Sequence, residues 1–124
     1  MKRLVSFFEI PAADFGRAVK FYESLFHVKL EVMDCGHEKM ACFPEQEGVC
    51  PGSISWSSDF EFRPSAQGVL VSLHCPELED ALLYVGEHGG RVLIPKTKIE
   101  AENRGWFAVV LDCEGNRVGL YSDK

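Results

Sequence analysis

The sequence predicts an α+β fold built from two βαβββ units in one compact domain over residues 1–124. The first observation is an internal repeat. Residues 11–22 and residues 76–85 each follow a strand-like run and begin an amphipathic helix, and Ala18 and Ala81 lie 63 positions apart (81 − 18) in a chain of 124 residues. A fixed period of this kind indicates a duplicated structural unit. The second observation is a hydrophobic content of 46%, which suffices for an ordinary core in a single domain.

The first unit, residues 1–58, is predicted to contain a strand, a helix and three further strands. Residues 5–10 form a short apolar run that Pro11 ends. Asp14 is a suitable N-cap for the helix that follows. Apolar residues recur at helical spacing and predict a broad face that packs on a sheet: Phe15, Ala18, Val19, Tyr22, Leu25 and Phe26. The remaining strands are predicted over residues 28–33, 39–43 and 53–57.

The second unit, residues 68–124, is predicted to repeat this order after a linker at residues 59–67, which is polar and aromatic and follows neither period. Its helix is expected over residues 77–88. Gly89 and Gly90 follow this helix and supply a C-terminal cap, because glycine accepts a left-handed backbone without steric cost. The strands of this unit are predicted over residues 69–74, 91–95, 106–111 and 117–122.

The composition argues against several classes of function. A net charge of −6 disfavours binding to nucleic acid or to anionic membranes, since both need a basic surface, but it is compatible with a cationic ligand. No stretch approaches the roughly 20 apolar residues that cross a bilayer, and residues 1–3 are not followed by the apolar region of a secretory signal. We therefore expect a cytoplasmic protein.

The five cysteines are an odd number at wide spacing and include no Cys-x-x-Cys motif. This pattern argues against a disulfide framework and against a thiolate zinc site. We expect reduced, mostly buried thiols. The cysteines are Cys35, Cys42, Cys50, Cys75 and Cys113.

Several short segments carry a family resemblance, and no one of them would suffice alone. They are Phe8-Glu9-Ile10-Pro11 with Ala18-Val19-Lys20-Phe21-Tyr22, Gly89-Gly90-Arg91-Val92, Pro95-Lys96-Thr97, and Leu111-Asp112-Cys113-Glu114-Gly115-Asn116-Arg117-Val118-Gly119-Leu120. With the repeat, they make the whole chain resemble the vicinal oxygen chelate superfamily, and within it the small bacterial glyoxalase-like proteins. This superfamily includes glyoxalase I, extradiol dioxygenases, fosfomycin-resistance enzymes and bleomycin-resistance proteins. The resemblance implies that the two units form a cup-shaped mixed sheet around a ligand, with the helices outside, and that the protein is a homodimer.

Metal-dependent members of that superfamily hold a divalent ion with four inward side chains. They are a His or Gln on the first strand of each unit and a Glu on its last strand. The resemblance places these positions at Phe7, Ser55, Leu70 and Gly119. A benzyl group, an aliphatic chain and a missing side chain donate no lone pair, and a neutral serine is a poor ligand for a divalent cation. We therefore expect no metal and no cofactor.

Side chains alternate across a strand, so residues two positions away from these four are expected to line the same cup. The candidate ligand-binding residues are Phe7, Ser53, Ser55, Ser57, Leu70, Ser72, Trp106, Arg117 and Tyr121. Trp106, Phe7 and Tyr121 are expected to close a small pocket where Gly119 leaves room. The alternatives are an ordinary half-solvated strand for the serines and a core aromatic role for Tyr121.

Glu9 and His74 are the candidate catalytic residues. They are expected at equivalent places, each shortly before the proline that ends its strand. Facing one another in the cup, a carboxylate and an imidazole can move a proton or grip a polar ligand. A hydrogen-bonded pair at the rim, or two separately solvated strand ends, is the alternative.

Three functions remain open at this point. We favour a protein of the bleomycin-resistance kind that binds an unknown small molecule in the cup without the divalent metal of the superfamily. The alternative is a metal-independent lyase or isomerase in which Glu9 and His74 transfer protons on a small carbonyl compound. The third is an interaction or regulatory module whose sheet serves only as a dimer platform. The resemblance does not name a ligand, because members of one scaffold differ in chemistry.

Overall fold

The computed structural model describes residues 4–100 and 105–124, and the chain divides into two compact units, Met1–Pro64 and Ser65–Lys124. The boundary between the units falls within the linker expected at residues 59–67. That both units belong to one domain stays a prediction. Within the described ranges no helix has the length and apolar character needed to cross a membrane.

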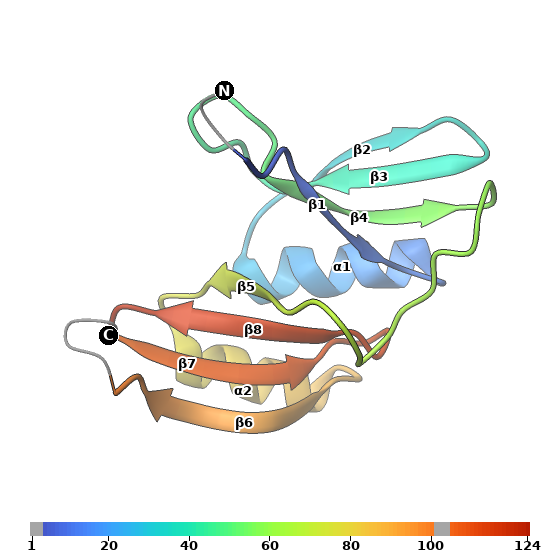
Figure 1. Ribbon diagram of the computed structural model, residues 1–124. Coiled ribbons are helices and arrows are strands. Elements are labelled where there is room, and N and C mark those ends of the chain that lie inside the picture. Colours follow the sequence, from blue (N-terminus) through green and yellow to red (C-terminus); the bar gives the residue numbers. More distant parts are fainter. Residues whose placement is uncertain (1–3, 101–104) are drawn as a thin grey trace. The chain divides into compact units, whose positions relative to one another are not determined.

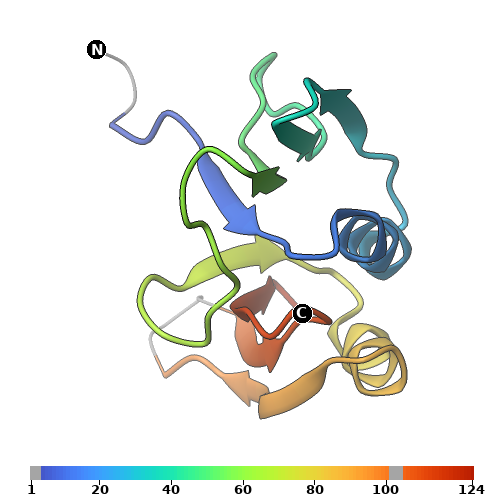
Figure 2. The same cartoon turned by 90° about the vertical axis from the view of Figure 1, so that its right-hand side faces the viewer.

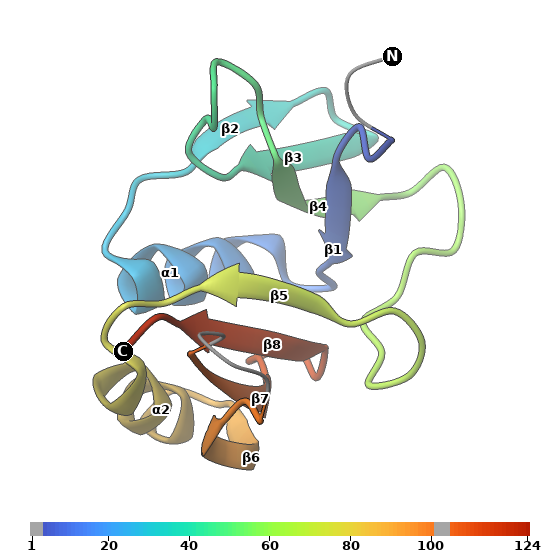
Figure 3. The ribbon, with the colours of Figure 1, turned by 60° about the vertical axis from the view of Figure 1, so that its left-hand side comes forward.

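The first unit has the order strand, helix and three strands: β1 (Phe8–Pro11), α1 (Phe15–Phe26), β2 (Glu31–Asp34), β3 (Glu38–Cys42) and β4 (Gly52–Ser57). The strands form one sheet in the order β1-β4-β3-β2, in which β1 runs parallel to β4 and the other neighbours are antiparallel (Figures 1 and 3). The carboxylate of Asp14 accepts a hydrogen bond from the Arg17 amide at 3.1 Å. This contact confirms the predicted N-cap of α1.

The core of the first unit lies between α1 and one face of this sheet. Ile54 on β4 is opposite Ile10 on β1 and Ala41 on β3, and all three are buried. Phe43 shares the face of Ala41, and Tyr22 from α1 meets its ring edge-on with the centroids 5.9 Å apart. Even-numbered positions of β1 and β4 therefore face the helix, and odd-numbered positions face away from it.

The second unit repeats the order with β5 (Val71–His74), α2 (Leu78–Glu87), β6 (Arg91–Lys98), β7 (Trp106–Leu111) and β8 (Arg117–Ser122). Its sheet has the order β5-β8-β7-β6, with β5 parallel to β8. Helix α2 lies on one side of all four strands (Figure 2) and buries Leu78, Ala81 and Val85. Equal element order and equal sheet order in both units confirm the predicted α+β fold with a duplicated βαβββ unit.

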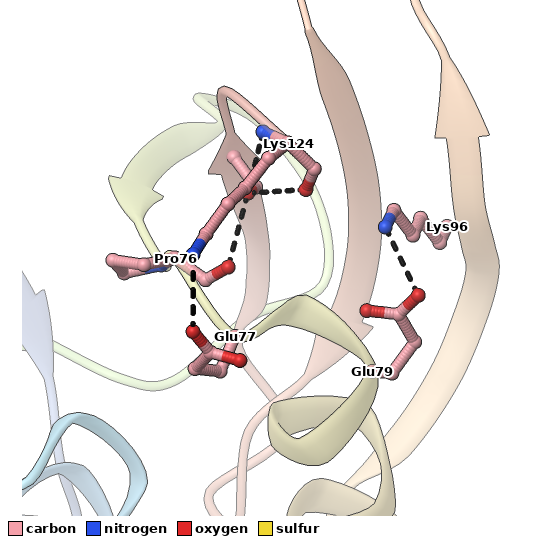
Figure 4. A network of polar contacts seen from close by, with 6 residues as sticks. Pro76, Glu77, Glu79, Lys96 and Lys124 are labelled. Atoms are coloured by element: carbon pink, nitrogen blue, oxygen red, sulfur yellow. Dashed lines mark hydrogen bonds and ion pairs between the residues drawn. The ribbon is translucent and has the colours of Figure 1, made fainter.

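A network of polar contacts joins the start of α2 to the strands of the second unit (Figure 4). The Ser122 hydroxyl donates to the Pro76 carbonyl at 3.2 Å, and Lys124 Nζ lies 3.5 Å from the Glu77 carboxylate. On β6, Lys96 Nζ donates to the Glu79 carboxylate at 3.0 Å. These contacts connect the start of α2 to β6 and to the end of β8.

Some boundaries differ from the sequence prediction for identifiable reasons. The strand expected at residues 28–33 begins only at Glu31, because the chain leaves α1 through His27 in the left-handed conformation (φ 55°) and the Leu30 amide donates to the Glu23 carboxylate at 2.8 Å. The strand expected at residues 91–95 continues to Lys98. It is an edge strand with register shifts, and such strands accept a proline that lacks an amide proton.

Candidate functional site

In the first unit, the sheet face turned away from α1 carries the candidate residues expected there. Glu9 lies opposite Ser53, and Ser55 and Ser57 follow on the same face of β4. Ser53 and Ser55 are 0% and 3% exposed, and their hydroxyls hydrogen-bond to each other at 2.8 Å. The Ser57 hydroxyl accepts a hydrogen bond from the Asp59 amide at 3.0 Å. The serine hydroxyls are thus engaged locally, and whether they also contact a ligand stays a prediction.

In the second unit, four candidate positions likewise share the sheet face turned away from α2. Ser72 lies opposite Gly119, and His74 lies opposite Tyr121 with the ring centroids 6.0 Å apart. The Tyr121 hydroxyl donates to the Asp123 carboxylate at 3.0 Å. The expected room beside Gly119 is absent, because Ser72 Oγ would lie 2.5 Å from a Cβ at this position.

Trp106 does not share a face with Tyr121, so the expectation that the two close one pocket is wrong. Trp106 lies opposite Ser122, whereas Phe107 lies opposite Tyr121. Successive residues of a strand point to opposite faces, so Trp106 points to the face that carries α2. The ammonium of Lys96, itself bound to α2, lies 4.9 Å from the Trp106 ring centroid, which fits a structural cation–π contact.

Arg117 is tied to the start of its own unit. Its guanidinium Nη2 donates to the Gly68 carbonyl at 3.2 Å, and its backbone amide donates to the Ser65 carbonyl at 3.3 Å. The Nε atom is buried and has no hydrogen-bond partner within the described ranges. The contacts observed for Arg117 therefore anchor residues 65–68.

Glu9 and His74 are not at equivalent places in the repeat. The first strands of the two units, Phe8–Pro11 and Val71–His74, are related by the same 63 positions as the helices (71 − 8). This relation matches Glu9 with Ser72, and Pro11 with His74. The equivalence was inferred from the prolines, which lie inside β1 but beyond the end of β5. Glu9 and His74 are both exposed on their own sheets, and their pairing stays a prediction.

The residues at the four superfamily metal positions do not fit a divalent ion. Phe7 and Leu70 precede their strands and are 49% and 45% exposed, and neither has a donor atom. The Ser55 hydroxyl forms a hydrogen bond with the Ser53 hydroxyl, and a neutral hydroxyl is a poor ligand for a divalent cation. Gly119 has no side chain. Within residues 4–100 and 105–124, no group of three His, Cys, Asp or Glu side chains is placed to hold a metal.

The cysteines are more accessible than the sequence predicted. Of the five, Cys75 is buried, Cys35 is exposed, and Cys42, Cys50 and Cys113 are partly exposed. The general tendency of free cysteine to be buried is therefore overridden here, because four of these residues lie at strand ends or in turns.

The sequence did not predict a pocket of about 510 Å³ that lies within the first unit. It is formed between the end of β4, residues 12–13 and the segment 58–64. The rings of Trp56, Phe60 and Phe62 line it, and the Phe60 and Phe62 centroids are 5.5 Å apart. Ser57, a candidate ligand-binding residue, also lines it. The sequence feature that could have indicated this pocket is the pair Phe60 and Phe62 in the segment assigned to the linker, because binding residues are often carried by loops.

Charged groups stand at the border of this pocket. Glu61 and Arg63 both line it and form an ion pair at 3.0 Å, with side chains 75% and 81% exposed. An ion pair this exposed contributes little to stability, so both groups are available to a ligand. The ammonium of Lys39 lies 5.2 Å from the Trp56 ring centroid. The pocket therefore combines aromatic walls and hydroxyls with one carboxylate and one guanidinium, and the Lys39 ammonium lies beside its Trp56 ring.

No protein-family model and no curated protein matches this chain. Solved structures do match it. A glyoxylase/bleomycin resistance protein/dioxygenase domain from Frankia sp. EAN1pec has a TM-score of 0.70 and 14% identity over 100% of both chains. A glyoxalase family protein from Bacillus cereus has a TM-score of 0.70 and 14% identity over 98% of this chain and 95% of its own.

Glyoxalase I from Zea mays matches with a TM-score of 0.66 and 17% identity over 93% of this chain, which spans only 44% of the maize protein. At these identities the likeness establishes the fold, which is the duplicated βαβββ fold of glyoxalase and bleomycin-resistance proteins.

Proposed function

We propose that this chain binds a small organic molecule with an aromatic or apolar body, and that it does so without a divalent metal ion. The observation that carries the proposal is the 510 Å³ pocket of the first unit with its rings Trp56, Phe60 and Phe62. Ligand pockets commonly have volumes of about 300–1,000 Å³ and are lined by aromatic side chains with a few polar groups. The fold shared with glyoxalase and bleomycin-resistance proteins supports the same class of function.

The polar groups at the pocket indicate which ligands to test first. Glu61 offers a carboxylate and Arg63 a guanidinium, while Ser57 and Ser58 contribute hydroxyls. The chain has a net charge of −6, which favours a ligand with a positive group. Planar organic cations are therefore the first class to test, and neutral aromatic molecules are the second.

Fluorescence of Trp56 tests the proposal directly. The chain has two tryptophans, so Trp106→Phe leaves Trp56 as the sole indole reporter inside the pocket. We expect a saturable change of its emission with members of a library of planar aromatic compounds, both cationic and neutral. Phe60→Ala and Phe62→Ala should each weaken such binding about tenfold, which corresponds to about 1.4 kcal/mol.

Leu83→Ala is the matched control, because Leu83 is an apolar residue on α2 of the other unit and is 66% exposed. It should leave the affinity unchanged. Binding that persists at full strength in both phenylalanine variants would place the ligand outside this pocket. Absence of saturable binding across the whole library would contradict the proposal.

The alternative we propose is a metal-independent lyase or isomerase that uses Glu9 and His74. Both side chains are exposed on the sheet face that their own helix does not cover, so a substrate can reach each of them. In a preparation that turns over a small carbonyl compound, Glu9→Gln should abolish turnover, since an amide cannot accept the proton. Unchanged turnover would contradict this mechanism.

We also propose that the protein is a homodimer. Edge strand β2 supports an intermolecular contact, because Val32 and Met33 on it are both 50% exposed. Light scattering at micromolar concentration should give twice the mass of the chain, and the mass of one chain would contradict the dimer.

A further inference from the structure

The hydrogen bonds of the β3–β4 connection bring two cysteines together. Cys42 is the last residue of β3, and Cys50 precedes β4 by one residue. The carbonyl of Gly52 accepts hydrogen bonds from the Phe43 amide at 2.9 Å and from the Cys50 thiol at 3.3 Å. Because Phe43 directly follows Cys42, this shared acceptor holds both cysteines at the same end of the strand pair.

The turn between the two cysteines keeps them in place. Gln46 and Val49 exchange two backbone hydrogen bonds of 2.8 and 3.0 Å. Glu47 and Gly48 between them have φ values of 53° and 79°, which reverse the chain tightly. The connection therefore closes on itself, which keeps Cys42 and Cys50 at the same end of the strand pair.

The surroundings of the pair assign the two thiols different reactivity. Burial, followed by the hydrogen bond and negative charge of Cys50 and the charge of Glu31, raises the pKa of the Cys42 thiol to about 11. Glu31 lies opposite Cys42 across β2 and β3. Cys42 therefore keeps its proton at neutral pH. Both residues are partly exposed, so a small oxidant can reach them.

We propose that Cys42 and Cys50 form a reversible disulfide when the protein meets a hydroperoxide. This inference is independent of the proposed small-molecule function. The cysteine pattern of the sequence argues only against a structural disulfide framework. The pair adjoins the candidate ligand face, because Glu31, Cys42, Ser53 and Glu9 form one row across the four strands.

The chemistry proceeds in two balanced steps. The Cys50 thiolate attacks the terminal oxygen of the hydroperoxide, the O–O bond breaks, and the departing alkoxide or hydroxide takes a proton, which leaves Cys50 as a sulfenic acid. Cys42 then loses its proton and its sulfur attacks that of Cys50, so that an S–S bond forms and water leaves. The two thiols lose two electrons and the hydroperoxide gains them. A dithiol reductant reverses the result.

The cleavage sites of this chain make the product easy to identify. Trypsin releases residues 40–91 as one peptide, because it does not cleave the Arg63–Pro64 bond, and this peptide contains Cys42, Cys50 and Cys75. After treatment of the whole protein with hydrogen peroxide, we expect this peptide to lose the mass of two hydrogen atoms and to take up a single alkyl group, on Cys75. Cleavage after Glu45 or Glu47 should leave two pieces joined until dithiothreitol is added.

Single substitutions separate the two roles. In Cys42→Ser, Cys50 should stop at the sulfenic acid and be trapped by dimedone. In Cys50→Ser, Cys42 should stay reduced at pH 7, because its thiol is protonated. Cys35→Ser is the matched control, since Cys35 lies outside the pair and is exposed; its peptide 40–91 should be oxidised as in the parent protein. Circular dichroism of each variant checks the fold.

Two results would overturn the inference. One is a peptide 40–91 that still takes up three alkyl groups after peroxide treatment. The other is a peroxide-induced disulfide that joins Cys42 or Cys50 to a different cysteine of the same chain or of a second chain.

Discussion

The hydroxyl of Ser72 occupies the space in which a side chain at Gly119 would stand. The two residues lie opposite each other on β5 and β8, and a Cβ at Gly119 would be 2.5 Å from Ser72 Oγ. Non-bonded carbon and oxygen atoms do not approach this closely. A side chain at this position of β8 therefore requires the Ser72 hydroxyl to turn aside, and in this structure the hydroxyl fills the room beside the glycine.

Gly119→Ala is expected to lower the free energy of unfolding by about 0.5–1.5 kcal/mol, because the exposed Ser72 side chain must turn away from its rotamer to admit the methyl group. Ser72→Ala removes the hydroxyl and leaves Ser72 Cβ 3.4 Å from the new methyl group. The double variant should therefore recover most of the loss in urea unfolding. Strictly additive effects of the two substitutions would show that the two side chains do not meet.

Asp112→Ala is expected to destabilise the turn between β7 and β8. Asp112 is 2% exposed, and one carboxylate oxygen accepts the amides of Glu114 and Asn116 at 2.8 and 2.9 Å, while the other accepts the Asn116 side chain at 3.1 Å. Loss of a buried charged acceptor costs about 1.5–3 kcal/mol. Thermal unfolding measures this cost. Asp112→Asn keeps one acceptor oxygen and should cost less, and equal costs for both variants would contradict this account.

The purified, untagged protein is expected to contain far less than one equivalent of divalent metal after dialysis without chelator. The reason is the donor set at Phe7, Ser55, Leu70 and Gly119, which offers a single neutral hydroxyl. Inductively coupled plasma mass spectrometry measures the content. A stoichiometric divalent ion would mean that other residues form a metal site, and it would bring glyoxalase-like or dioxygenase-like catalysis to the front.

Alkylation of Cys42 by iodoacetamide is expected to be slow at pH 8 and to accelerate about tenfold per pH unit toward pH 11, because only the thiolate reacts. The pKa of this thiol rises from 9.0 to about 11 in the folded chain. The folded state therefore holds a proton that the unfolded state releases, so this contribution to stability is complete below pH 9 and is lost as the pH rises to 11.

Cleavage after Glu45 or Glu47 separates Cys42 from Cys50, so mass spectrometry follows each alkylation rate by itself. A Cys42 rate that levels off near pH 9 would contradict the raised pKa.

Local patterns predicted most of the fold. The helix boundaries followed from Asp14 and from the spacing of Ala18 and Ala81, because an N-cap and a repeated apolar face are encoded within a few residues. Strands β7 and β8 were predicted at their observed bounds. The sequence prediction ended strand β6 too early, at Pro95. The strand accepts this proline because it lies at the sheet edge, and the sequence of the strand alone does not show that position.

The candidate site was less accessible to sequence reasoning. Alternation along a strand placed Glu9 with the serines of β4 and His74 with Tyr121, because the period of a strand is two. On β7, the same alternation places Phe107 on the face of Tyr121 and Trp106 on the opposite face. The register between strands decides such relations, and it depends on turns and on packing that no single segment encodes.

The sequence by itself determined the duplicated βαβββ order, the two helices and the lack of metal-ligating side chains at Phe7, Leu70 and Gly119, since these are properties of neighbouring residues or of residue type. Only the tertiary structure decided that Ser72 fills the room at Gly119 and that Cys42 meets Cys50. It also brought Phe60 and Phe62 together with Trp56 around a pocket. These residues come together through strand pairing and chain reversal. The energy of such contacts depends on the whole unit and is not encoded in any one segment.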